Sequence, residues 1–251
     1  MPGGGRLEGR IALLTGASRG LGAAVAVRFA AEGAHPVLLA RTPGALEEVD
    51  DRIRAEGGRA TLLTADLCES GKIEDLAAAL FERFGRLDIL VAAAAELGPL
   101  SPLGHYDPQT WSRVIDLDLT VNWRLIRALD PLLRLSPAGR AIFVTCALGR
   151  EPAPYWGPYA VAKAGLEALV RIYAGEVAKS SVRANLVDPG AMRTGLRARA
   201  FPGEDPGSLP APESLTEAFV RLALGECREN GALVLAQDPE LAPGPGFQVC
   251  A

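Results

Sequence analysis

The chain has 251 residues, of which 49% are hydrophobic and 22% are charged, a balance typical of a soluble globular domain with a full core. Its net charge of −4 provides no general attraction to nucleic acid or to an anionic membrane, and its two histidines argue against a His-based triad or a metal site. The lack of an apolar signal core and of ~18 consecutive apolar residues, with four cysteines that show no C-x-x-C spacing, favours a cytoplasmic protein with free thiols.

Apolar runs and amphipathic stretches alternate along the whole chain. We expect strands at residues 11–15, 36–40, 60–64, 87–92, 140–145, 182–187 and 232–236. We expect helices at residues 21–32, 44–56, 72–84, 108–135, 157–179 and 215–225, with Pro131 kinking or resetting the last turn of the fourth. This order predicts a doubly wound, three-layer α/β fold in which helices cover both faces of a parallel seven-stranded sheet. We expect one domain over residues 1–251, with an irregular tail at 238–251.

A glycine-rich segment at residues 15–22, T-G-A-S-R-G-L-G, joins the first expected strand to the first helix. Glycines let the backbone approach a ligand closely, and the amino terminus of a helix favours an anion. The segment therefore predicts a turn that binds nucleotide phosphates, although an ordinary glycine-rich turn has the same composition. The residues that would line this turn are Gly16, Ser18, Arg19, Gly20, Leu21 and Gly22.

The second and third expected strands indicate which nucleotide binds. In such a sheet the ligand lies beyond the carboxyl ends of the strands. The second strand runs into Arg41 and has no acid there to bind a free ribose 2′-hydroxyl, and Arg19 can point the same way. Two guanidinium groups suit a 2′-phosphate, so we expect NADP(H) rather than NAD(H), the alternative being two solvated arginines. Asp66, beside Leu67, either accepts a hydrogen bond from adenine or caps a turn.

Tyr159 and Lys163 lie four residues apart, on one face of an expected helix. A lysine cation favours the phenolate, so it is expected to lower the pKa of Tyr159 and make this residue a proton donor or acceptor near neutral pH. Pairs with this spacing also occur on exposed helix faces without any function.

Residues 15–22, the Tyr159/Lys163 pair and Asp188-Pro189-Gly190 with Thr194 together closely resemble the short-chain dehydrogenase/reductases over nearly the whole chain. The resemblance implies a Rossmann-type domain, a nicotinamide cofactor and hydride transfer between a carbonyl and a secondary alcohol. It makes Tyr159 the acid/base and Lys163 the residue that binds the nicotinamide ribose. The positions that it implies at the carboxamide end of the cofactor are Pro189, Gly190, Met192 and Thr194.

Further segments are similar to one bacterial branch of this family, which has no established substrate. They are Trp156-Gly157, residues 192–206 and Ala236-Gln237. Related sequences are often labelled 3-oxoacyl-carrier-protein reductases, so the substrate is expected to be a small carbonyl compound or alcohol. The resemblance also implies that residues 108–135 and 157–179 form the contacts of a homodimer or homotetramer.

Residues 191–212 occupy the position of the family's substrate lid. Their prolines and glycines predict a mobile or irregular loop. Within this segment Arg193, Arg197 and Arg199 either meet an acidic substrate, such as a phosphopantetheine arm, or form a solvated helix face.

The sequence departs from the family at three places. Cys146 stands where the family has a catalytic serine, and a thiol is a weaker hydrogen-bond donor than a hydroxyl. Asp118 stands where the family has a relay asparagine, and Asn122 lies one turn further on. The family's Asn-Asn-Ala-Gly is replaced by four alanines at residues 92–95, which places Ala93 and Ala94 beside the cofactor and removes a side chain that ties the sheet together.

Two hypotheses follow from these departures. The first is a working NADP(H)-dependent reductase that is slowed by Cys146 and Asp118. The second is an NADP(H)-binding protein, a sensor or a subunit, that does not turn over. A third idea makes Cys146 a reactive nucleophile activated by Lys163.

Overall fold

The computed structural model describes residues 5–238, which form one seven-stranded sheet in which every strand pair is parallel. The strands are β1 (Ile11–Thr15), β2 (His35–Ala40), β3 (Thr61–Thr64), β4 (Ile89–Ala92), β5 (Arg140–Val144), β6 (Arg183–Asp188) and β7 (Leu233–Leu235). Their order in the sheet is β3-β2-β1-β4-β5-β6-β7. The chain thus winds outward from β1 to β3, crosses back to β4 and winds outward again to β7, which confirms the predicted doubly wound topology.

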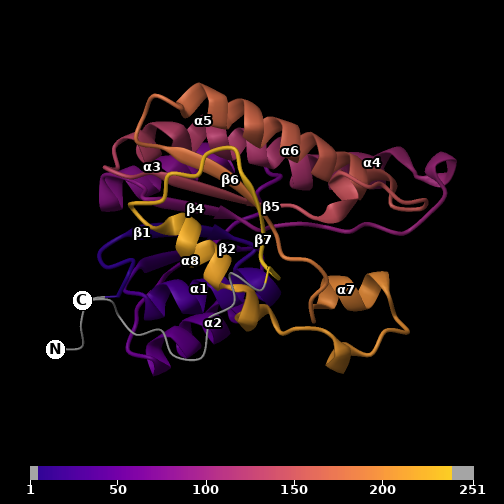
Figure 1. The fold of residues 1–251 in the computed structure, drawn as a ribbon, viewed down its shortest axis with the longest axis horizontal. Helices are drawn as coiled ribbons and strands as arrows, with labels where there is room; N and C mark the ends of the chain where they lie inside the picture. Colours follow the sequence, from indigo (N-terminus) through magenta and orange to yellow (C-terminus); the bar gives the residue numbers. More distant parts are fainter. Residues whose placement is uncertain (1–4, 239–251) are drawn as a thin grey trace.

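Helices cover both faces of this sheet (Figure 1). Their bounds are α1 (Gly20–Ala31), α2 (Pro43–Ala55), α3 (Lys72–Phe84), α4 (Pro108–Ile115), α5 (Val121–Arg134), α6 (Gly157–Val177), α7 (Gly195–Ala200) and α8 (Glu217–Ala223). Helices α1, α2 and α8 cover one face, and α3, α5 and α6 cover the other. The three layers agree with the sequence prediction.

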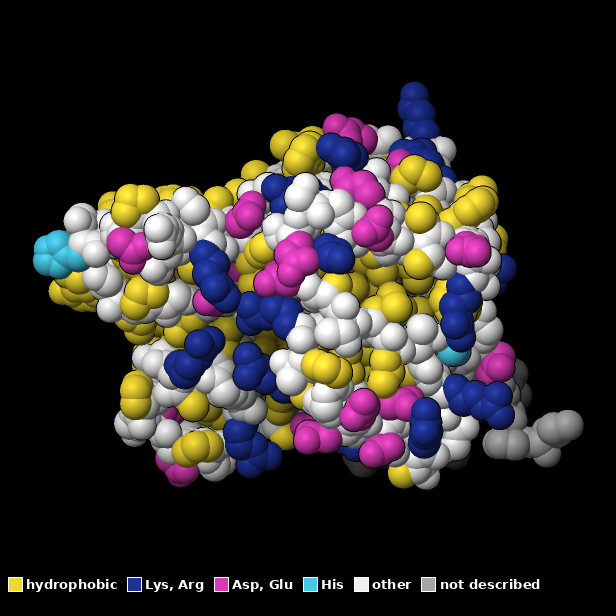
Figure 2. Space-filling model, turned by 180° about the vertical axis from the view of Figure 1, so that it is seen from behind, with side chains coloured by type: hydrophobic (Ala, Val, Ile, Leu, Met, Phe, Trp, Pro, Cys, Tyr) yellow, Lys and Arg dark blue, Asp and Glu magenta, His cyan; other side chains and the backbone are white. Residues whose placement is uncertain are grey.

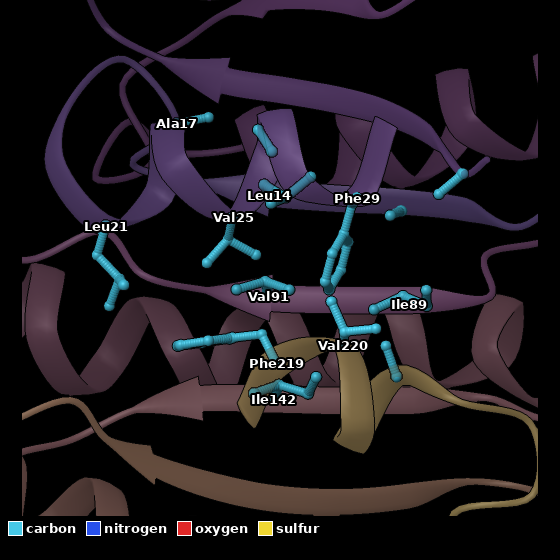
Figure 3. Packing of buried hydrophobic residues seen from close by; sticks show 14 of the residues in the cluster. Leu14, Ala17, Leu21, Val25, Phe29, Ile89, Val91, Ile142, Phe219 and Val220 are labelled. Atoms are coloured by element: carbon cyan, nitrogen blue, oxygen red, sulfur yellow. The ribbon is translucent and has the colours of Figure 1, made fainter. Parts of the chain in front are cut away.

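A cluster of apolar side chains fills the space between the sheet and α1 with α8 (Figure 3). Phe29 from α1 and Phe219 from α8 are completely buried against the strand residues Val91 and Ile142. Burial of one such large side chain stabilises a fold by about 1.5–3 kcal/mol. These contacts hold the carboxyl edge of the sheet, where β1 ends, in a fixed position.

The strand register brings the ends of the central strands to one level. Thr15 at the end of β1 pairs with Leu39 on β2 and with Ala92 on β4. On the other half of the sheet, Val144 on β5 pairs with Val187 on β6. The segments that follow these strands therefore meet along one edge. In Figure 1 the segment that leads to α4 and the segment that carries α7 both extend from this side.

The helix expected over residues 108–135 is divided in the structure. α4 and α5 are joined by a π-helical segment, Asp116–Thr120, whereas α5 continues through Pro131 to Arg134. The predicted reset at Pro131 is therefore wrong. A proline near the carboxyl end removes only one intrahelical hydrogen bond, whereas a π turn inserts an extra residue and often marks a functional site. This turn contains Asp118, which is fully buried.

The expected lid, residues 191–212, is more regular than predicted. It contains α7, which begins at Thr194, whose side chain accepts a hydrogen bond from the Arg197 N–H at 3.3 Å. A short 3₁₀ turn follows at Pro206–Ser208. The tail expected to be irregular lies, from residue 239 on, outside the described residues. In the part of the chain that the structure describes, no helix is both long enough and apolar enough to span a membrane.

Candidate active site

The glycine-rich segment packs so closely that side chains are excluded from it. Gly16 has φ of +67°, and a Cβ there would lie 2.8 Å from Ala94 Cα. A Cβ at Gly22 would lie 2.4 Å from the Gly16 carbonyl oxygen. Arg19 precedes α1 in an extended conformation, and its side chain makes no capping hydrogen bond. No side chain therefore caps the first N–H groups of this twelve-residue helix, which a phosphate group would need.

Thr15 ties this turn to the neighbouring strand. Its Oγ1 accepts hydrogen bonds from the N–H groups of Ala93 at 3.1 Å and Ala94 at 3.2 Å. The side chain is buried at the end of β1. Thr15 thus supplies the link across the sheet that the alanine run at 92–95 was expected to lack. The sequence signal was a polar residue that closes an apolar strand.

The three residues predicted near the adenosine lie at the same edge. Arg41 follows β2 and is exposed, as is Arg19. The Ala17 N–H donates to the Leu39 carbonyl at 3.3 Å, which fixes the glycine-rich turn beside the end of β2. Asp66 follows β3, and its Oδ1 accepts from the Cys68 N–H at 3.0 Å, which is the turn role anticipated for it. Leu67 is buried.

All four predicted catalytic side chains converge beyond β5. Lys163 on α6 is 3% exposed, and its Nζ donates to the Val144 carbonyl at 3.1 Å. The same Nζ lies 4.0 Å from Asp118 Oδ2 and 5.5 Å from the ring centroid of Tyr159. Cys146, which follows β5, packs against the cluster of side chains that contains Tyr159. Residues distant in sequence therefore form one cluster around the lysine.

Burial dominates the protonation of this cluster. It raises the pKa of Tyr159 well above its usual value, and the nearby Cys146 and Asp118 raise it further. Burial likewise raises the pKa of the Cys146 thiol, against the opposing charge of Lys163. Burial outweighs the effect of Lys163 in this structure, so the pKa of Tyr159 is raised rather than brought near neutrality as the spacing predicted. A raised thiol pKa also argues against Cys146 as an activated nucleophile.

Asp118 is held inside the protein by backbone contacts. Its Oδ1 accepts from the Glu96 N–H at 2.8 Å, and its carbonyl accepts from Asn122 Nδ2 at 2.9 Å. Burial raises the pKa of Asp118 to about 6, while the charge of Lys163 lowers it. Asn122 therefore supports the π turn through the backbone of Asp118.

Apolar residues pack around the Tyr159 side chain. The residues packed with Tyr159 are Ala95, Leu97, Val114, Cys146, Leu148, Trp156, Leu196 and Ala200. The Trp156 ring centroid lies 6.2 Å from that of Tyr159 and 5.7 Å from that of Phe201, just beyond α7. The lid thus contacts the start of α6 through aromatic rings. Phe201 carried no sequence signal beyond its place in a segment similar to one family branch.

The family model for the short chain dehydrogenases matches residues 10–205. The chain belongs to the short-chain dehydrogenase family. It is therefore an oxidoreductase by family, and this family binds NAD or NADP.

Its relatives in this family include YciK of Escherichia coli strain K12, described as an uncharacterized oxidoreductase, which is 33% identical over 241 residues and 95% of each chain. A structure of a short chain dehydrogenase from Pseudomonas syringae is 37% identical, with a TM-score of 0.90 over 93% of this chain and 97% of that one. A short chain dehydrogenase from Shigella flexneri 2a strain 301, complexed with NADP, is 33% identical, with a TM-score of 0.90 over 94% and 100%. The expected resemblance to a bacterial branch is confirmed.

This short-chain dehydrogenase holds its Pro189-Gly190 turn with an ion-pair network that the sequence did not reveal. Arg150 bonds both Glu167 and Asp188, two buried carboxylates. Asp188 Oδ1 also accepts from the Gly190 N–H at 2.9 Å, and Gln237 Nε2 donates to the Pro189 carbonyl at 3.0 Å. The turn predicted at the carboxamide end of the cofactor is thus fixed from two sides.

Thr194 and Met192 follow this turn and lie beside the rest of the predicted cofactor site. A Cβ at Gly20 would lie 3.3 Å from Thr194 Cγ2, so the first turn of α1 and the lid approach each other. Met192 packs against the core cluster that contains Leu21. The structure therefore brings the two ends of the predicted site together.

The basic residues of the lid differ in their availability. Arg197 bonds Glu204 at 2.6 Å, and its guanidinium carbon lies 3.7 Å from the ring centroid of Phe201. It is therefore engaged within the lid, which disfavours the first of the two alternatives for this residue, contact with an acidic substrate. Arg193 and Arg199 are exposed. Figure 2 shows Lys and Arg side chains gathered along a hollow on one face of the molecule. Within residues 5–238 no three His, Cys, Asp or Glu side chains converge on a metal-sized site.

Proposed function

We propose that this short-chain dehydrogenase interconverts a carbonyl compound and a secondary alcohol, using NADP(H), with Tyr159 as the acid/base. The observation that carries the proposal is the convergence of buried Tyr159 and Lys163 at the same sheet edge as the glycine-rich turn. In doubly wound sheets ligands bind at this edge.

The residues at the edge fit a dinucleotide. The glycine-rich turn has no room for a Cβ at Gly16, so its backbone is free to approach a phosphate. Arg19 and Arg41 would hold the 2′-phosphate, and the residues after Pro189 would hold the carboxamide end. NADP in the complex of the Shigella flexneri relative supports this preference. When bound, NADPH supplies a hydride to the carbonyl carbon.

Tyr159 supplies the proton. Because burial keeps the pKa of Tyr159 above its ordinary value, the hydroxyl is protonated at neutral pH and ready to donate to a carbonyl oxygen. Cys146 stands beside this hydroxyl, where its thiol provides a weaker hydrogen bond to the substrate oxygen than a serine would. We therefore propose that reduction proceeds, more slowly than a serine at position 146 would allow.

The apolar residues around Tyr159 limit the substrate. Leu97, Leu148 and Trp156 belong to the apolar cluster that contains Tyr159. We therefore propose that the carbonyl is attached to an apolar body, which apolar ketones and 3-oxoacyl thioesters both provide.

We also propose that the chain forms a homodimer or homotetramer through α5 and α6. These helices expose large apolar side chains to solvent, among them Trp123 and Ile172 at 46% and 61%. Exposed apolar residues of this size are typical of surfaces that bury against a partner.

The experiment follows NADPH oxidation against a panel of apolar ketones and 3-oxoacyl thioesters. We expect Tyr159→Phe to lower turnover by about 10²–10⁴-fold while NADPH binding, measured by thermal shift, stays unchanged. Tyr173→Phe is the matched control, because Tyr173 lies on the same helix and its hydroxyl donates to Asp130 at 2.8 Å, away from the site. Full activity in Tyr159→Phe would contradict the proposal.

A second candidate is an NADP(H)-binding protein without turnover. The observation that favours it is the packing of Cys146, a weak hydrogen-bond donor, beside Tyr159 at a position where the family has a serine. Tight NADPH binding with no turnover on the panel, and turnover restored by Cys146→Ser with Asp118→Asn, would select this candidate over the first.

A further inference from the structure

Asp118 is a buried carboxylate, and its second side-chain oxygen, Oδ2, takes no part in the proposed reduction. Its side chain is 0% exposed, and its Oδ1 is satisfied by the Glu96 N–H. No hydrogen-bond partner for Oδ2 occurs among residues 5–238. A buried carboxylate without compensation is unfavourable, and here the compensating cation is Lys163, at 4.0 Å from Oδ2.

Lys163 lies between this carboxylate and Tyr159. Its Nζ is 5.5 Å from the Tyr159 ring centroid, and both side chains are buried. With water excluded, charges at such separations interact far more strongly than on a surface. One ammonium therefore acts on two acidic groups, the Asp118 carboxyl and the Tyr159 phenol.

Other polar and titratable groups lie around the pair on neighbouring segments. Glu96 offers its backbone to Asp118, and its own carboxylate bonds Arg113 of α4 at 2.9 Å. From α5, Asn122 contributes a neutral amide to the Asp118 carbonyl. On the other side Tyr159 meets the neutral thiol of Cys146 after β5, and Asp188 at the end of β6 is already bonded to Arg150. Lys163 is thus the cation that pairs with Asp118 and lies over the Tyr159 ring.

We propose that Asp118 offsets the positive charge of Lys163 and so keeps Tyr159 a proton donor up to a higher pH than the lysine alone would allow. Asp118 is a positioning residue for protonation, since it acts on Tyr159 and on Lys163 rather than on the substrate. The inference rests on the proposed function, in which Tyr159 is the acid/base.

The charges of Asp118 and Lys163 determine in which direction the pKa of Tyr159 changes when Asp118 is replaced. Tyr159 loses its proton in the alkaline range, where Asp118 is ionised, so the phenolate forms beside a lysine whose charge is already paired. The negative charge of Asp118 contributes to the raised pKa of Tyr159, and the charge of Lys163 lowers the pKa of Asp118. Removing the carboxylate charge frees the lysine to stabilise the phenolate, which lowers the pKa of Tyr159.

The same shift affects the two reaction directions in opposite ways. Carbonyl reduction uses the phenol and fails above the pKa of Tyr159, whereas alcohol oxidation uses the phenolate and rises with pH up to that pKa. In Asp118→Asn both transitions are expected at lower pH. The rate of alcohol oxidation near neutral pH is then expected to rise about tenfold. The rate of carbonyl reduction is expected to fall at a lower pH than in the parent protein.

The deciding measurement needs no turnover. The phenolate of the full-length chain, without nucleotide, is titrated by ultraviolet absorbance, and the titration of Tyr159→Phe is subtracted to isolate Tyr159. We expect Asp118→Asn to increase the ionisation constant of Tyr159 about tenfold or more. Asp116→Asn is the matched control, because Asp116 lies in the same π segment but is 37% exposed and faces Arg124 at 3.8 Å. It should leave the titration unchanged.

Asp118→Ala serves as a second variant, so that a folding defect in Asp118→Asn leaves the test intact, and thermal melting verifies both. An unchanged Tyr159 titration in folded Asp118→Asn and Asp118→Ala overturns the inference. A shifted titration in a protein that never reduces a carbonyl supports the inference and overturns the proposed function instead. Turnover that depends on Tyr159, together with an unchanged Tyr159 titration in the Asp118 variants, supports the proposed function and overturns the inference.

Discussion

The two ends of the site differ in how they are built. At the glycine-rich turn, backbone geometry does the work: Gly16 needs positive φ and has no space for a Cβ, and the helix amino terminus offers N–H groups. At the other end, the buried side chains of Asp118, Tyr159 and Lys163 meet half-buried Cys146, and Lys163 lies 4.0 Å from the Asp118 carboxylate. The turn depends on shape, whereas the cluster depends on protonation.

This difference explains which of the positions that differ from the family pattern are expected to change the chemistry of the site. The glycine pattern of the turn is intact, and the loss of the family's asparagines at residues 92–95 is covered by Thr15, which bonds Ala93 and Ala94. In the cluster, by contrast, Cys146 and Asp118 each change a hydrogen-bonding or charged group. A shape-based region tolerates substitutions that preserve the backbone, whereas a protonation-based region changes its chemistry with one atom.

Gly16→Ala has the largest expected effect and should lower the affinity for NADPH about 100-fold. The new Cβ would lie 2.8 Å from Ala94 Cα, so the turn or the segment after β4 must shift, in addition to the strain of a positive φ, about 1–3 kcal/mol. Thermal-shift titration with NADPH measures the affinity. The arrangement of the catalytic cluster on α6 should survive, as judged by the unchanged Tyr159 titration.

Gly57→Ala is the matched control for Gly16→Ala, because it introduces the same backbone strain without a close contact of the new Cβ. Gly57 has φ of +81°, and nothing lies within 4 Å of a Cβ there. It should lose stability by about 1–2 kcal/mol and keep its NADPH affinity. Equal losses of affinity in the two variants would show that the turn is not the binding site.

The sequence predicted the shape-based region well and the cluster only in outline. Strand order, the parallel sheet and the turn follow from apolar periodicity and glycine spacing, which are local properties. The pKa of Tyr159 depends on burial that is set by Trp156 and the lid, and no spacing of Tyr159 and Lys163 contains that information. The π turn at Asp118 and the Arg150 network are likewise results of tertiary packing.

Cys146→Ser tests the protonation-based end, with an expected rise in turnover of about 10- to 100-fold. A hydroxyl donates a stronger hydrogen bond than a thiol to the developing oxyanion, and one such donor is worth about 10²–10³-fold in rate. NADPH affinity should not change. The matched control is Cys68→Ser, a half-buried thiol beyond β3 on the other half of the sheet. A Cys146→Ser protein no faster than its parent, with cofactor bound, would argue against the proposed role of this position.

Arg41→Ala has the smallest expected effect on nucleotide affinity. It tests whether charge, as well as backbone shape, contributes to binding at the nucleotide end of the site. Arg41 is exposed, so solvent screens its pairing with a phosphate, and we expect NADPH affinity to fall about tenfold with little change for NADH. Arg59→Ala removes the same charge from a residue just before β3, at the amino edge of the sheet, and should affect neither nucleotide. Equal weakening of NADPH and NADH by Arg41→Ala would remove the 2′-phosphate assignment, because only NADPH carries that group. The glycine-rich turn would then bind the dinucleotide by shape alone.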